Sequence, residues 1–94
     1  SMENECQRMS SYMDLRLHIE NNNELQLKVP TCLDSKMNMW LGFYKFNSGK
    51  IISAHGKTSF QLTNNFNHAL SDYMQDGGAE DVMKSFVPIN KENK

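Results

Sequence analysis

The stretch Met37–Ala54, MNMWLGFYKFNSGKIISA, predicts a long strand, a tight turn and a returning strand. Successive residues of a strand point to opposite faces, and this strand carries large apolar side chains on both. The two sets are Met37, Met39, Leu41 and Phe43, and Trp40, Tyr44 and Phe46. Gly49, in the turn Asn47-Ser48-Gly49, can take the positive φ that such turns need. We expect this hairpin at the centre of a sheet.

An earlier hairpin has only one apolar face. Apolar residues alternate with polar ones over 13–20 and again over 24–29, which predicts two strands with one buried and one solvated face. Asn21-Asn22-Asn23 predicts the turn between them. We expect Pro30 to end the second strand, because proline has no N–H for a central ladder.

Period two continues over 57–63 and predicts a fifth strand, after which the period becomes helical. The apolar stripe consists of Phe66, Ala69, Leu70, Tyr73 and Met74. Asn64 or Asn65 is the expected N-cap and Gly77-Gly78 the expected end. Residues 79–86 repeat the spacing on a shorter helix, which Pro88 stops.

These elements predict an α+β fold: an antiparallel β-meander of about five strands (two hairpins plus one) packed on a C-terminal helix, with a second short helix. The chain has 94 residues, enough for one modest core. We expect a single domain over 13–87, a flexible tail over 88–94, and over 1–12 a tag remnant and a flexible or short helical lead. Ser1-Met2 is typical of an expression scar, so we expect a piece of a larger protein.

Composition argues against several classes of protein. The net charge of −1 predicts no overall attraction to nucleic acid or membrane, and the chain has no 18-residue apolar run. With no signal peptide and only two cysteines, Cys6 and Cys32, we expect free thiols in the cytoplasm or nucleus. No cysteine or histidine spacing fits a metal site, so we expect neither metal nor cofactor.

We also expect no enzymatic activity and no small-molecule substrate. Catalysis would require Cys32 as a nucleophile with His55 or His68 as its base, and nothing local activates Cys32. Asp72 with Asp76 has the spacing of a solvated helix face. Domains this small are seldom complete catalysts.

The middle of the chain is basic. From Asp34 to Asp72 there is no other acid, and between them lie Lys36, Lys45, Lys50 and Lys57. Beside the aromatic residues of the central hairpin, these lysines could form a surface for a protein partner or for single-stranded nucleic acid. The alternative is that they are solvated strand ends, where lysine discourages pairing between sheets.

The candidate partner-binding residues are therefore Trp40, Tyr44 and Phe46, with Lys45 and Lys50 as rim charges. A large exposed aromatic patch usually marks a partner surface. If the helices instead cover the even-numbered face, the same rings belong to the core. The sequence leaves both possibilities open.

Two families resemble this order of elements. Polo-box domains are similar in having antiparallel hairpins, here 15–29 and 41–54, followed by a packing helix, here 66–74. RWD-like heads of kinetochore proteins are similar in having a leading helix, a four-stranded meander and trailing helices. Lys91-Glu92-Asn93 resembles the KEN box, a degradation signal.

Both resemblances imply a non-catalytic protein–protein interaction module, self-association included, in a larger intracellular protein such as a cell-division scaffold. The alternative function is a single-stranded nucleic-acid-binding module that uses the basic and aromatic central hairpin.

Overall fold

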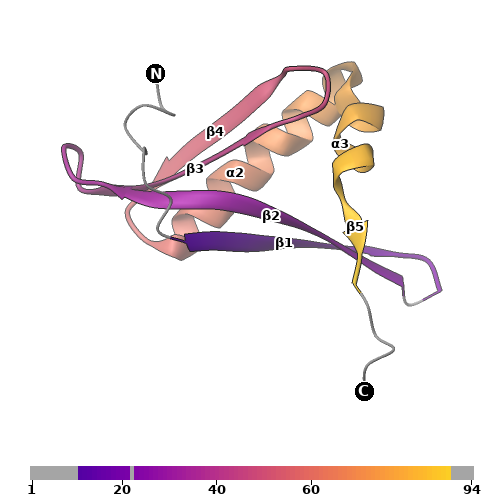
Figure 1. The fold of residues 1–94 in the computed structure, drawn as a ribbon, viewed down its shortest axis with the longest axis horizontal. Coiled ribbons are helices and arrows are strands. Elements are labelled where there is room, and N and C mark those ends of the chain that lie inside the picture. The colour runs from indigo at the N-terminus through magenta and orange to yellow at the C-terminus, as the bar shows by residue number, and fades with distance from the viewer. Residues whose placement is uncertain (1–10, 22, 90–94) are drawn as a thin grey trace.

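The structure, a computed structural model, describes residues 11–21 and 23–89. Strands β1 (Ser11–Ile19), β2 (Asn23–Asp34), β3 (Met39–Lys45) and β4 (Ile51–Gly56) follow one another along the chain (Figure 1). After them come α2 (Ser59–Tyr73), a kinked turn η1 (Met74–Gly78), α3 (Ala79–Ser85) and a short β5 (Val87–Pro88). The predicted α+β class, a meander with a fifth strand against C-terminal helices, is confirmed.

The sheet has the order β1-β2-β3-β4, and every pairing is antiparallel. Strand β1 pairs with β2 over 23–31, β3 pairs with 31–34, and β5 pairs with Leu25 and Gln26. Because β3 leaves β2 beyond Gly42, the two hairpins diverge, and α3 lies between their separated ends (Figure 1). The sheet is therefore an open wedge.

The core fills this wedge on the face that α2 covers. It consists of odd-numbered residues of the first hairpin, of even-numbered residues on either side of the turn in the second hairpin, and of residues from the helical part of the chain. The buried members are Leu15, Leu27, Val29, Phe46, Ile52, Phe66, Leu70, Val82 and Phe86. A smaller cluster of Cys32 and Leu41, with Phe43 packed against it, lies on the opposite face.

The strand predicted over 57–63 is wrong, since α2 begins at Ser59. Thr58, rather than Asn64 or Asn65, is the N-cap, and its side-chain oxygen accepts a hydrogen bond from the Gln61 N–H at 3.1 Å. The fifth strand is Val87–Pro88 instead. The cap and the helical stripe of Leu62, Phe66 and Leu70 outweigh the short alternation of apolar and polar residues. As a consequence, Phe60 lies on the outer side of the helix and is 74% exposed.

The prediction that Pro30 ends its strand is also wrong, because β2 continues to Asp34. The Glu24 carbonyl accepts from the Ile89 N–H of the β5 segment, so even-numbered residues of β2 direct their main-chain groups to that side. Residues 27–30 have neither β3 nor β5 as a partner in the described register. Pro30 therefore faces a gap where a missing N–H breaks no ladder.

The turn predictions are confirmed at two positions, since Asn21 has a φ of 68° and Gly49 a φ of 98°. Gly77, at 99°, lies in the π-turn between α2 and α3. The sheet begins at Ser11 and includes Pro88, slightly beyond both limits of the predicted 13–87 domain. Residues 1–10 and 91–93, with Cys6 and the KEN-like motif, lie outside the described residues.

The expected free thiol at Cys32 is wrong. Cys32 is 3% exposed and disulfide-bonded. Among the described residues, no helix has the length and apolar character needed to cross a membrane.

Candidate functional site

The predicted aromatic residues lie on the face that α2 covers. Phe46 is 2% exposed and belongs to the core, with its ring centroid 4.8 Å from that of Tyr44 and 6.0 Å from that of Tyr73. Trp40 and Tyr44 are half-buried. Phe46 is therefore core, whereas partner contact by Trp40 and Tyr44 stays a prediction.

The two predicted rim lysines are separated. Lys45 is exposed and, as the cross-strand partner of Ile51, lies on the face opposite α2. Lys50 precedes β4 and turns toward α2, where its Nζ lies 5.2 Å from the centroid of the Tyr73 ring. The structure thus joins Lys50 to a helix residue that the sequence did not connect with it.

Strand β4 forms one edge of the sheet, and its main-chain groups alternate in direction. The Phe46 N–H donates to the Lys50 carbonyl at 2.8 Å, so this carbonyl and the main-chain groups of Ile52 and Ala54 point toward β3. Ile51 and Ser53 consequently direct their N–H and C=O groups outward, where the described residues provide no partner strand. This edge is open to a further strand.

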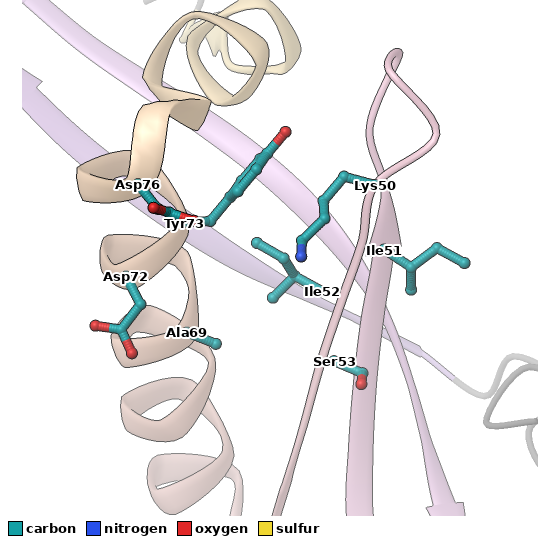
Figure 2. A pocket seen from close by; sticks show the side chains of 8 residues that line it. All are labelled: Lys50, Ile51, Ile52, Ser53, Ala69, Asp72, Tyr73 and Asp76. Atoms are coloured by element: carbon teal, nitrogen blue, oxygen red, sulfur yellow. The ribbon is translucent and has the colours of Figure 1, made fainter.

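Helix α2 packs mainly against β4, and its Asn65 side chain donates to the outward His55 carbonyl at 2.7 Å. Between helix and strand is a cavity of about 390 Å³ (Figure 2). Its lining is Lys50, Ile51, Ile52, Ser53, Ala69, Asp72, Tyr73 and Asp76. In Figure 2 the Lys50 side chain reaches into the space between strand and helix, while Ile51 points away from α2.

A polar network connects two lining residues of this cavity, Lys50 and Tyr73, to α3. Asp81, in α3, accepts hydrogen bonds from the Ser48 hydroxyl, from the Tyr73 hydroxyl at 2.8 Å and from the Ser48 N–H at 3.2 Å. The Ser48 hydroxyl in turn accepts from the Lys50 N–H at 3.2 Å. The network therefore ties the β3–β4 turn to both helices and positions Lys50 and Tyr73.

The same hydrogen bonds change the acidity of Asp81. Donors that favour the carboxylate, above all the Ser48 hydroxyl, hold the pKa of Asp81 below its ordinary value of 3.8. No sequence pattern links Ser48 with Asp81, because they are 33 residues apart.

The α2 wall of the cavity is negative. Asp72 and Asp76 are both exposed and one helical turn apart, and neither belongs to an ion pair among the described residues. They are solvated helix residues, as their spacing predicts, but they also line the cavity beside an open strand edge.

Cys32 and His55, two of the residues nominated for catalysis, do not come together. Cys32 and His55 flank Leu41 on neighbouring strands, so two strand spacings, about 10 Å, separate them. That is beyond reach of a hydrogen bond, and Cys32 is disulfide-bonded. Within 11–21 and 23–89, no group of three or more acidic, histidine or cysteine side chains could hold a metal ion. The absence of enzymatic activity stays a prediction.

In comparisons with known proteins, no family model, curated protein or solved structure matches this chain. The resemblance to polo-box and RWD-like domains therefore stays a prediction. The functional argument rests on the geometry of β4 and α2.

Proposed function

We propose that this domain is a non-catalytic protein-interaction module that takes up an extended segment of a protein partner as an additional strand beside β4. The observation that carries the proposal is the pair Ile51 and Ser53, whose main-chain groups point outward beside a cavity under α2. In strand addition, main-chain hydrogen bonds supply affinity and side-chain pockets supply specificity. Both components are present at this edge.

The composition of β4 supports the proposal. Proteins usually protect an edge strand with charged side chains, proline or a covering segment. Between Lys50 and His55 the sequence is Ile-Ile-Ser-Ala, with neither charge nor proline. An incoming strand would therefore displace no strongly hydrated side chain from the edge itself.

The predicted partner-binding residues take different parts in this proposal. Lys50 lines the cavity and faces the incoming segment. Tyr44 pairs across the ladder with Ile52, and Phe46 packs in the core behind it, so these two rings support the edge from within. Direct contact of Trp40 with a partner is a separate prediction, because Trp40 lines a smaller cavity of about 120 Å³ near the start of α2.

The nucleic-acid alternative receives less support at this site. A phosphate drawn to Lys50 would also approach the carboxylates of Asp72 and Asp76, which line the same cavity. A protein segment, by contrast, can present neutral main chain to the edge.

The cellular setting is a further part of the proposal. A larger intracellular protein of the cell-division scaffold type follows only from the order of elements. Disulfides persist mainly in oxidising compartments, so the bond at Cys32 weighs against the cytoplasmic or nuclear expectation. The thiol content of protein purified without reductant tests this point.

The test begins with peptides selected on the immobilised domain from a phage-displayed library of random dodecapeptides. Their affinities are then measured by calorimetry for the wild type and for Ser53→Pro. Proline at 53 removes an outward N–H and leaves the β3–β4 ladder intact. We expect at least about tenfold weaker binding to this variant, because the pairing hydrogen bonds are lost.

Asp14→Pro is the matched control. Leu15 and Leu17 pair inward with β2, so Asp14 directs its N–H to the free edge of β1. The control therefore makes the same backbone change on the opposite edge, and we expect it to leave peptide binding unchanged. Circular dichroism checks that both variants are folded.

Three results would contradict the proposal. Peptides that bind Ser53→Pro as well as the wild type would place the interaction elsewhere. A dimer that Ser53→Pro dissociates, with no peptide selected, would assign the edge to a second copy of the chain. Salt-sensitive binding of a single-stranded oligonucleotide, again without peptide binding, would favour the nucleic-acid alternative.

A further inference from the structure

We propose that the partner segment carries a lysine or arginine opposite Ile52, with its cationic group between Asp72 and Asp76. This inference rests on the proposed strand addition at β4 and names the chemistry of the segment that binds there.

The register of the incoming strand follows from the hydrogen bonds already made at this edge. The His55 carbonyl accepts from the Asn65 side chain at 2.7 Å, and the Lys57 N–H donates to the Gln61 side chain at 2.9 Å. Full pairing is thereby limited to Ile51 and Ser53. The residue of the incoming strand that lies between these two pairings is the one opposite Ile52.

The side chain of that residue points into the cavity. Residues directly opposite each other in a strand pair project from the same face of the sheet. Ile52 faces α2 and is 5% exposed, so the residue opposite it also projects toward α2. The neighbouring residues of the incoming strand, opposite Ile51 and Ser53, project to the other face.

The cavity suits a long side chain with a cationic end. Ile52, Ala69 and the ring of Tyr73 provide apolar surface for an aliphatic stem (Figure 2). The charged lining consists of the carboxylates of Asp72 and Asp76 and the ammonium of Lys50, which sum to −1. One cation from the partner makes the lined cavity neutral.

The local structure does not compensate the charge of the two carboxylates. Like charges four residues apart on a helix repel each other, and the C-terminal end of a helix disfavours anions. Asp72 lies in the last turn of α2, Asp76 follows that turn, and the last turn contains no basic residue. Neither carboxylate has a hydrogen bond or ion pair among the described residues. A cation from the partner would reduce the repulsion between the two carboxylates and their unfavourable interaction with the C-terminal end of α2.

The test sequences the dodecapeptides selected on the wild type, on the double variant Asp72→Asn/Asp76→Asn and on the control Asp14→Asn. We expect one position to be enriched in lysine or arginine on the wild type and the control, but not on the double variant. A peptide selected on the wild type should bind the double variant roughly five- to tenfold more weakly. Because the carboxylates are exposed, high salt should remove this difference.

The outcomes separate this inference from the proposed function. If the peptides lose affinity for Ser53→Pro but show no basic position and bind the double variant equally well, the inference is wrong and strand addition stands. Unchanged affinity after the basic residue is replaced by norleucine would also overturn it. If Ser53→Pro binds as well as the wild type, strand addition itself fails, and the inference fails with it.

Discussion

The two edges of the sheet differ in their side chains and in their surroundings. Strand β1 has nine residues, and those whose main-chain groups point outward are the exposed Tyr12, Asp14, Arg16 and His18. Strand β4 has six residues, and its outward groups belong to Ile51, Ser53 and His55. Helix α2 packs against β4, and no comparable helix packs against β1 in the part of the chain that the structure describes.

Both edges offer unpaired backbone, so hydrogen bonding alone does not distinguish them. A strand that paired with β1 would have to desolvate a carboxylate and a guanidinium, which is costly. A strand that paired with β4 would meet Ile51 and Ser53 at the edge itself, beside a cavity whose charged lining residues are Lys50, Asp72 and Asp76. The difference shows that the availability of an edge depends on its side chains and on the nearest helix.

The largest expected effect comes from Gly56→Ala, which breaks the contact between α2 and β4. A Cβ at position 56 would lie 2.3 Å from the Leu62 main-chain nitrogen, and backbone cannot rotate away as a side chain can. We expect the free energy of unfolding to fall by about 3 kcal/mol or more. Urea unfolding followed by the fluorescence of Trp40 measures it.

Gly42→Ala is the control for this prediction. Its Cβ would meet the end of the flexible Met13 side chain at 3.2 Å, so we expect a loss of about 1 kcal/mol. Equal losses for the two variants would mean that α2 does not rest directly on β4.

The next effect in size separates the two sides of β4. Ala54 directs its N–H into the ladder with β3, whereas Ser53 directs its N–H outward. We expect Ala54→Pro to lower the free energy of unfolding by about 2–3 kcal/mol. Ser53→Pro should cost less than about 1 kcal/mol. If urea unfolding ranks the two variants in the opposite order, the assignment of the open groups is wrong.

The smallest effect concerns the turn between β3 and β4, where Ser48 donates hydrogen bonds to the Asp81 carboxylate of α3. Because the pKa of Asp81 is lowered on folding, the unfolded chain binds more protons at acid pH. The stability that Asp81 contributes is therefore complete above its ordinary pKa of 3.8 and is lost as the pH falls below it.

Asp81→Asn should remove this dependence, so the stability difference between wild type and variant should shrink as the pH falls from about 5 to about 2. Thermal unfolding over this range measures it, with Glu80→Gln as the control from the same helical turn. A difference that stays constant with pH would show that the carboxylate charge does not hold the turn.

Much of the fold was predictable because its signals are local. Alternation marked the first hairpin, runs of apolar residues on either side of a turn marked the second, Asn21 and Gly49 marked the turns, and helical spacing marked the second half of α2. The start of α2 was missed, although Thr58 and Gln61 have the Ser/Thr-x-x-Glu/Gln spacing of a capping box. That signal could have excluded the strand predicted over 57–63.

The candidate site was only partly predictable. Lys50 was named among the partner-binding residues, but its neighbours Asp72 and Tyr73 come from a helix that begins after the next strand. Pro30 was misjudged because its position between β3 and β5 depends on pairings formed by distant segments. Such juxtapositions leave no pattern in a single stretch of sequence.

The sequence by itself determined which residues share a face and where the chain turns, because both follow from the period of a strand and the φ preferences of single residues. Only the tertiary structure decided which face of Met37–Ala54 packs against α2. Both faces of this hairpin are apolar, so local pattern favours neither. The choice depends on where α2 packs, and the same packing placed Phe46 in the core and a cavity beside the open edge of β4.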